Sequence, residues 1–172
     1  MANEPITIYK LIILYTLSKI DAPLPPGIIS DYIISHEYTN YFTLQNALGE
    51  LLNADLIREE STYHLTYYTL TKSGRETLSL FGSSLSLKIR KEIDEFLQER
   101  KYKIIDDISF ISDYHRTKDG SYLASCTIRD HNHILMHLEL DVTTETDAIK
   151  ICENWKRESS VLYQTAIQKL LK

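Results

Sequence analysis

Hydrophobic residues follow two different spacings along the chain, and the change lies near its middle. Up to about residue 82 they mostly recur every three or four positions, which predicts helices with one buried side. From about residue 104 they occupy alternate positions, which predicts strands with one buried face. We therefore predict two structural units, residues 1–82 and 104–172, joined by an amphipathic connecting helix at residues 83–103.

The first unit is predicted to contain three helices followed by a hairpin and a fourth helix. The first helix spans residues 5–20, the second begins at the proline pair 25–26, where a first turn tolerates proline, and the third spans residues 40–53. After them, "LIREE", "STYHLTYYTLT" and "KSGRETLSLF" predict a short strand, a polar tip with a second strand, and another helix. This order of elements is typical of a winged helix-turn-helix domain.

The second unit is predicted to be a three-stranded antiparallel meander covered by a long C-terminal helix, from about residue 144 to 171. "TKDG" and "RDHNH" supply the two turns. The resulting fold class is α+β, with an N-terminal winged helix-turn-helix domain followed by an α+β sensing or dimerisation domain. One face of the meander is predicted to be buried, and we call it the dry face. It is predicted to carry Ile108, Phe110, Tyr114, Tyr122, Ala124, Cys126, Ile128, Ile134, Met136, Leu138, Leu140 and Val142.

Four segments also resemble one known family. They are "YKLIILYTL", "HEYTNYFTLQNAL", "YYTLTKSGRETL" and "ICENWK", and together they are similar to the bacterial family called domain of unknown function 4364. Its members are described as predicted transcriptional regulators of the winged-helix type. The resemblance implies the same fold and a regulatory role, although a fold alone does not establish an activity.

The segment "RDHNHILMH" contains three histidines and raises the question of a metal site. If Met136 and Leu138 face the core, His133 and His137 face water. They are then roughly 13 Å apart along the strand, too far to share one ion. His131 lies in the preceding turn, so we predict a solvated polar face and no metal site.

No catalytic motif is present, since the chain lacks GxSxG, HExxH and a phosphate-binding glycine loop and has only 5 glycines. Asp106 and Asp107 are adjacent, so in a strand they would face opposite sides and could not act as an acid–base pair. We predict a protein that is not an enzyme and needs no cofactor. Cys126 and Cys152 are interpreted as small buried hydrophobes, with a redox-sensing pair as the alternative.

The apolar segment "LIILY" is too short to span a membrane, so we predict a cytoplasmic protein with no membrane association.

Through Gly82 the chain has 5 Lys and Arg against 9 Asp and Glu. This balance is unfavourable for DNA binding, which normally depends on neutralising phosphates. Double-stranded DNA is nevertheless the predicted partner. The candidate contacts on the recognition helix, the wing and the neighbouring basic positions are Thr39, Asn40, Tyr41, Thr43, Gln45, Asn46, Arg58, Ser61, Thr62, Tyr63, His64, Lys72 and Arg75.

Two functions remain in view from the sequence. The first is a DNA-binding transcriptional regulator, and the alternative is a winged-helix module that binds proteins, for which acidic charge is no handicap. Apolar residues on nearly every side of the first helix (Ile8, Leu11, Ile12, Ile13, Leu14, Leu17) also predict a two-fold homodimer. The contact would be made by this helix or by the helix at Leu85–Leu97. Any small-molecule effector is unknown.

Overall fold

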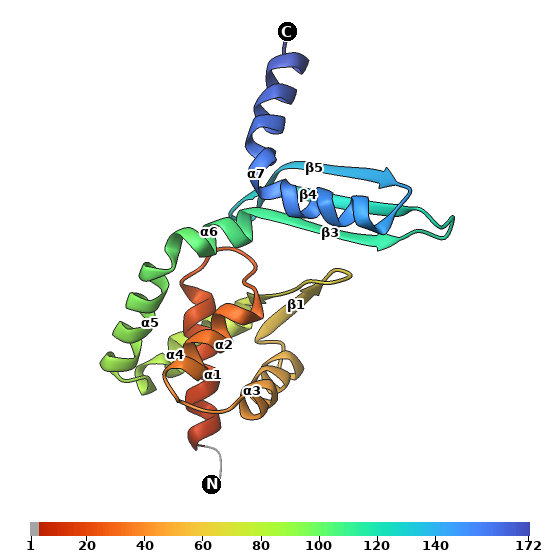
Figure 1. Cartoon of the computed structure of the whole chain (residues 1–172). Helices are drawn as coiled ribbons and strands as arrows, with labels where there is room; N and C mark the ends of the chain where they lie inside the picture. The colour runs from red at the N-terminus through yellow and green to blue at the C-terminus, as the bar shows by residue number, and fades with distance from the viewer. Residues whose placement is uncertain (1–3) are drawn as a thin grey trace. The chain divides into compact units, whose positions relative to one another are not determined.

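A computed structural model describes residues 4–172, with side chains from Thr7 onward, and shows a mixed α+β protein (Figure 1). The chain forms two compact units. One contains the residues up to Ser61 together with Thr66–Ile104, and the other contains Thr62–Leu65 together with Ile105–Lys172. In chain order the elements are α1 (Glu4–Ser18), α2 (Pro26–Ser35), α3 (Tyr41–Asn53), β1 (Ile57–Ser61), β2 (Thr66–Leu70), α4 (Lys72–Phe81), the short 3₁₀ helix η1 (Gly82–Ser84), α5 (Leu87–Glu99), α6 (Lys101–Ser109), β3 (Phe110–Arg116), β4 (Tyr122–Asp130), β5 (His133–Val142) and α7 (Glu145–Leu170).

Helix α1 forms the centre of the first unit. Leu11, Ile12, Ile13, Leu14 and Leu17 are each no more than 3% exposed, because α1 packs against both α3 and α4. Five of the six apolar residues on which the dimer prediction rested are therefore covered within the first unit, while Ile8 is half-buried. The homodimer itself stays a prediction.

Helix α5 is attached to the same unit by an aromatic cluster. Tyr32 of α2 meets the ring of Phe96 edge-on at 5.2 Å between centroids, and the hydroxyl of Tyr38 donates a 2.6 Å hydrogen bond to Glu92. Ile93 and Leu97 are buried, whereas Leu87 at the start of the helix is 81% exposed. The predicted connecting helix is thus part of the first unit's packing for most of its length.

The spacing of Leu44, Leu48, Leu51 and Leu52 predicts one buried side of helix α3, and either Thr39 or Asn40 is predicted to cap it. Asn40 accepts a 3.0 Å hydrogen bond from the backbone NH of Thr43, the interaction expected of an N-cap. Leu44, Leu48 and Leu51 are buried as predicted. Ala47 joins them, while Leu52 is only half-buried. The packing of this side leaves the opposite side of α3 facing solvent.

Strands β1 and β2 form an antiparallel hairpin in which Ile57 pairs with Leu70. The segment between α1 and α2 adds a third strand-like contact that the sequence did not predict. Leu24 and Tyr68 exchange two backbone hydrogen bonds of 2.9 Å, in an isolated antiparallel bridge. The hairpin is thereby tied to the loop before α2.

The start of α4 is fixed by Thr71. Its hydroxyl donates to the carbonyls of Asp55 and Leu56, at 2.7 and 3.0 Å, and accepts from the backbone NH of Gly74. This contact brings the backbone of Gly74 so close to Leu56 that a Cβ at position 74 would overlap the carbonyl oxygen of Leu56. Glycine is required here for close approach rather than for turn geometry.

The second unit is built on an antiparallel sheet with the order β3-β4-β5. Ala124, Cys126 and Ile128 of β4 are buried on one face, as predicted, and α7 packs over this face, mainly on β3 and β4 (Figure 1). Within α7, Trp155 is buried and donates a 3.1 Å hydrogen bond from Nε1 to the carbonyl of Thr127. The predicted α+β arrangement of this unit is confirmed.

Two details of the predicted meander are wrong. Ile108 lies in helix α6 and not in the first strand, which begins only at Phe110. Ile134 pairs with Arg129, while Met136 pairs with Ile128, so an irregularity in the register displaces Leu135. Ile134 is 51% exposed and does not continue the dry face. A local bulge of this kind is decided by strand pairing, and alternation alone does not reveal it.

We predict opposite effects of alanine at two helical glycines. Gly74→Ala should destabilise the protein by about 1–3 kcal/mol, because overpacking against a fixed carbonyl forces the backbone to shift. Gly49→Ala, in the interior of α3 with no atom within 4 Å of the new Cβ, should stabilise it by about 0.5–1 kcal/mol. Chemical denaturation of both variants measures the difference, and equal effects would contradict the close approach at Gly74.

Candidate nucleic-acid interface

The exposed side of α3 and its N-terminus carry most of the predicted base and phosphate contacts. Asn46 is exposed, while Gln45, Thr43 and Thr39 are half-buried. Tyr41 is 63% exposed at the first turn. Asn40 is also exposed, and since its Oδ1 caps the helix, its amide NH₂ is the group that can donate to a ligand.

The strands of the hairpin present a mixed rather than a basic surface. Arg58 is highly exposed and lies 3.9 Å from the carboxylate of Asp55, an ion pair at the limit of contact. Its neighbours Glu59 and Glu60 are exposed on the same strand. The hydroxyl of Ser61 donates to Glu59 at 3.1 Å. The positive charge of Arg58 is therefore offset locally by acidic groups.

The hairpin loop, which belongs to the second unit, is bound to one buried carboxylate. Asp113 on β3 is 8% exposed. Its oxygens accept hydrogen bonds from the Thr62 hydroxyl and, at 2.9 Å, from the backbone NH of His64. Its Oδ1 also lies 2.6 Å from Nδ1 of His64. Two of the predicted wing contacts, Thr62 and His64, thus have their polar groups engaged within the protein.

Two ring contacts accompany these hydrogen bonds. Tyr63 stacks on His115 with ring centroids 4.1 Å apart, and His64 stacks on Tyr114 at 4.7 Å. Tyr63 nevertheless remains 67% exposed. Of the loop residues predicted to meet DNA, Tyr63 is therefore the one that keeps a largely accessible side chain without a hydrogen bond to Asp113.

The hydrogen bonds determine the charge state of Asp113. Burial by itself raises the pKa of this carboxyl. The hydrogen bonds from Thr62, from His64 and from the backbone of Tyr114 outweigh burial and leave the pKa below the ordinary value of 3.8. Asp113 is consequently ionised at neutral pH, and its charge stabilises the donors gathered around it.

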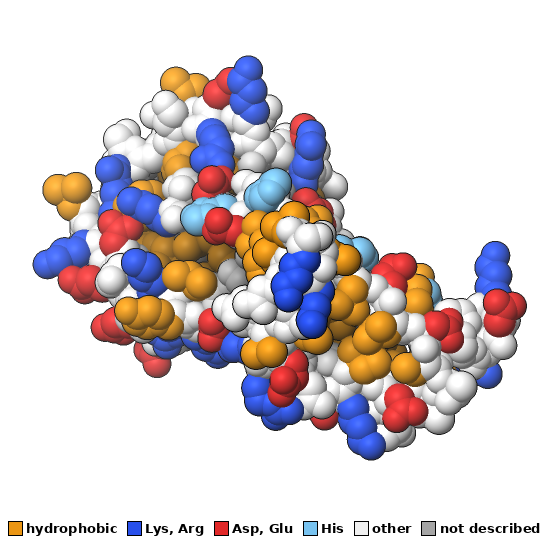
Figure 2. All heavy atoms as spheres, turned by 90° about the horizontal axis from the view of Figure 1, so that it is seen from above, with side chains coloured by type: hydrophobic (Ala, Val, Ile, Leu, Met, Phe, Trp, Pro, Cys, Tyr) orange, Lys and Arg blue, Asp and Glu red, His pale blue; other side chains and the backbone are white. Residues whose placement is uncertain are grey.

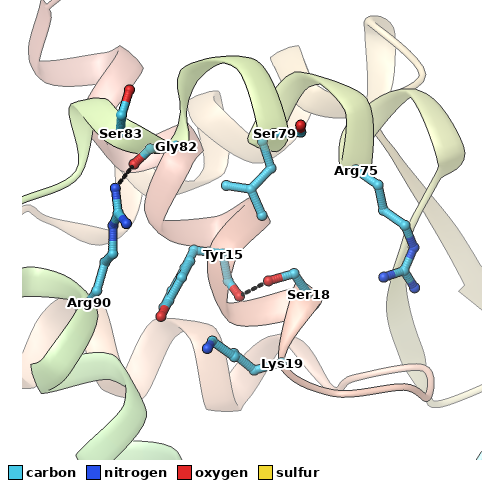
Figure 3. Close-up of a pocket in the computed structure, with 9 residues that line it drawn as sticks. Tyr15, Ser18, Lys19, Arg75, Ser79, Gly82, Ser83 and Arg90 are labelled. Carbon is cyan, nitrogen blue, oxygen red and sulfur yellow. Dashed lines mark hydrogen bonds between the residues drawn. The ribbon is translucent and has the colours of Figure 1, made fainter. Parts of the chain in front are cut away.

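Three basic side chains of the first unit line one pocket of about 600 Å³ (Figure 3). Lys19 comes from the end of α1, Arg75 from α4 and Arg90 from α5, and the hydroxyl groups of Tyr15 and Ser79 also line the pocket. Such a combination of cations and hydroxyl groups suits an anion. Sequence reasoning identified Arg75 but missed Lys19 and Arg90, which are distant in the chain.

These three cations differ in whether other groups of the protein already bind them. Lys19 lies 3.4 Å from Asp94, and its contact with Tyr15, followed by the charge of Asp94, raises the pKa of Lys19 despite partial burial. Arg90 donates to the carbonyl of Gly82, as the dashed line in Figure 3 shows. Arg75 is exposed and forms no ion pair with any side chain described from Thr7 onward. Arg75 is thus the most available of the three.

The histidines of the second turn are exposed, as predicted, but the register shift that moves Ile134 off the buried face also places His133 and His137 on opposite faces of the sheet. His133 and His137 are exposed, and His137 approaches the Thr127 hydroxyl at 2.9 Å through Nδ1. His131 sits in the turn with φ of 53° and contacts Asp130 at 2.8 Å. Within the described part of the chain, no three His, Cys, Asp or Glu side chains are arranged to hold a metal ion.

The two cysteines are free thiols. Cys126 is fully buried in the sheet, and burial raises its pKa to about 12. Burial also raises the pKa of Cys152, which is only partly covered. Because the thiolate is the reactive form, these shifts favour the interpretation as packed hydrophobes over that of a redox pair.

Comparison with known proteins adds one firm result. The family described as domain of unknown function 4364 matches residues 9–170, which is nearly the whole chain. The chain belongs to this family. No curated protein and no solved structure matches the chain, so the family description, which names no activity, is all that similarity contributes. Across residues 4–172, no helix is long and apolar enough to cross a membrane.

The site contains one further residue that sequence reasoning missed. Phe42, directly after Tyr41, is 74% exposed at the start of α3. Its position could have been inferred from the helical spacing, since Leu44, Leu48 and Leu51 define the buried side and Phe42 does not share it. The signal was present in the sequence, but an aromatic residue in a helical segment is ordinarily assigned to the core.

We predict that Asp113→Ala lowers the free energy of unfolding by about 1–3 kcal/mol, because several donors lose a charged acceptor. Since the folded pKa of Asp113 is depressed, the stabilisation is present above pH 3.8 and is lost as the pH falls through the folded value. The wild type and the variant should therefore converge in stability at strongly acidic pH. Urea denaturation at several pH values measures this.

Hydrogen exchange supplies a local readout for the same variant. The backbone amide of His64 should exchange faster in Asp113→Ala, since its acceptor is removed. Glu153→Ala, which removes an exposed carboxylate from α7, should change neither the exchange of His64 nor the stability by more than about 0.5 kcal/mol. An unchanged His64 amide in Asp113→Ala would show that the loop is not held by this carboxylate.

Proposed function

We propose that the protein is a DNA-binding transcriptional regulator, without catalytic activity, that acts in the cytoplasm through a winged helix-turn-helix in its first unit. The order α1, the Leu24 bridge, α2, α3, β1 and β2 supports this fold, with α3 as the recognition helix and the hairpin as the wing. The observation that carries the proposal is the difference in burial between the two sides of α3. One side is anchored in the core and the other presents polar side chains to solvent.

Base recognition is assigned to Gln45 and Asn46. A carboxamide can form two hydrogen bonds with the major-groove edge of adenine, and of these two residues Asn46 is exposed while Gln45 is half-buried. Phosphate contacts are assigned to Tyr41 and to the free NH₂ of Asn40, at the N-terminus of the same helix. These groups supply hydrogen bonds rather than charge, which suits the cation-poor segment through Gly82.

Charge-based contacts are assigned to Arg58, Lys72 and Arg75. Lys72 and Arg75 occupy the first turn of α4, and both are exposed. Lys19 and Arg90 strengthen the positive potential around Arg75 because they line the same pocket. The loop is assigned fewer DNA contacts than the sequence suggested, because the polar groups of Thr62 and His64 are already hydrogen-bonded to Asp113. Tyr63 is the loop residue that we assign to the nucleic acid.

A second candidate function is a protein-interaction module, and the exposure of Phe42 favours it. Phe42 and Tyr41 are 74% and 63% exposed and adjacent at the start of α3. Exposed aromatic side chains are enriched where proteins bind each other. The acidic balance of the first unit would not oppose such binding, whereas it weakens any attraction to DNA.

Fluorescence anisotropy against promoter fragments at two salt concentrations tests the DNA proposal. Lys72→Ala and Arg75→Ala should weaken binding to all fragments and reduce the salt slope by about 1 for each phosphate that is no longer neutralised. Asn46→Ala should cost about 1–3 kcal/mol at the preferred sequence only, with the salt slope nearly unchanged. The difference follows because phosphate contacts carry no sequence information.

Matched controls remove the same side-chain types elsewhere. Lys118→Ala deletes an exposed cation in the turn between β3 and β4, and Gln98→Ala deletes an exposed carboxamide on α5. Both should leave DNA affinity unchanged. If the wild type selects no fragment even at low salt, while binding to a protein partner is abolished by Phe42→Ala or Gln45→Ala, the regulator proposal fails and the interaction module replaces it.

A further inference from the structure

The sheet of the second unit is covered on only part of its apolar face. Helix α7 contacts β3 and β4 through specific hydrogen bonds, including Ser112 to the carbonyl of Cys152 at 3.2 Å. On β5, Leu138 pairs with Cys126, and Leu140 pairs with Ala124. Their β4 partners are fully buried, yet Leu138 is half-buried and Leu140 is 45% exposed. The β5 side of the face is therefore only partly covered within this unit.

An apolar groove of about 480 Å³ follows this uncovered strip. Leu138 and Leu140 form its sheet side, and Ile151, Trp155 and Leu162 form its helix side. Charged groups stand at its rim, where Asp147 and Glu158 outnumber Lys150. The groove is thus apolar at its base and slightly acidic at its edge.

The last part of α7 carries a second unpartnered apolar surface. Ala148, Trp155 and Ser159 are the buried side of the helix, and the same side continues as Leu162, Ala166 and Leu170 at spacings of three and four. Leu162 is 47% exposed and Leu170 is 82% exposed. Beyond Ser159 the core-facing side of the helix is therefore largely uncovered within the second unit.

The helix end does not fold back over its own groove. Figure 1 shows the first part of α7 lying along the sheet and the later part turning away from it. Figure 2, seen from above with the end of α7 toward the viewer, shows hydrophobic side chains around this end.

We propose that the protein forms a two-fold dimer in which the end of each α7 packs against the groove of the second copy. One chain carries both halves of the contact, an apolar helix end and an apolar groove, as an isologous interface requires. Charge is complementary as well. The segment after Glu158 contains Lys169 and Lys172 but no acidic residue, and it would approach the acidic rim of the groove.

A second copy accounts for more of the exposed surface than a small ligand does. An apolar small molecule would fill the groove but would leave Leu170 and Leu171 exposed at 82% and 80%. A partner helix covers the groove and the helix end together. This inference concerns self-association and does not rest on the proposed DNA binding, so either can fail without the other.

Sedimentation equilibrium of the full chain at micromolar concentration tests the dimer. The wild type should have twice the mass of one chain. Leu162→Asp and Leu170→Asp should each weaken association by about 30-fold or more, as expected when a charge replaces a central apolar contact. Both positions are solvent-exposed in one chain, so circular dichroism and melting of the variants should show an intact fold at concentrations where they are monomeric.

Three controls make the result specific. Gln164→Asp and Gln168→Asp add the same charge to the same turns on the opposite side of α7, and they should leave the dimer intact. Leu87→Asp removes the most exposed apolar residue of α5, the other helix that the sequence suggested as a contact. A monomeric wild type, a dimer abolished by Leu87→Asp but kept in Leu170→Asp, or a monomer that retains an apolar molecule in native mass spectrometry would overturn the proposal.

Discussion

The packing of α3 against α1 is the interaction on which the proposed recognition depends. Leu44, Leu48 and Leu51 enter a core built around the fully buried side chains of α1. Because a helix has only one orientation that buries these three residues, the same packing fixes Asn46 on the solvent side. The polar groups available for recognition are therefore set by the core, and any rotation of α3 would expose leucines.

The first unit holds few cations up to Gly82, the part that contains the proposed recognition elements. Three of its basic side chains gather in one pocket, where Lys19 is already paired with Asp94 and Arg90 donates to a backbone carbonyl. Arg75 is left as the exposed charge of this group. The DNA binding that we propose for α3 and the hairpin would therefore rely on hydrogen bonds from amide and hydroxyl groups, and its affinity would vary little with salt.

The second unit has one buried polar group with several partners and one apolar surface with few. Asp113 is buried beside donors of the loop Thr62–Leu65, and the free energy of burying its charge is offset only because several donors are present together. On the opposite face, the apolar strip along β5 and the end of α7 lack partners in one chain. The hydrogen bonds to Asp113 hold the loop within the unit, and the apolar surface is the one that we propose for self-association.

The sequence by itself determined the elements whose pattern is local. The cap at the start of α3, the inward leucines of that helix and the alternation along β4 each depend on neighbouring residues only, so residue type and local spacing are enough to predict them. Tertiary structure alone decided the Leu24 bridge, the gathering of Lys19, Arg75 and Arg90, and the engagement of Thr62 and His64 by Asp113. These features join residues far apart in the chain, and local periodicity carries no information about which distant groups meet. The burial of every side of α1 belongs to the same class, since how many faces of a helix are covered depends on how many other elements pack around it.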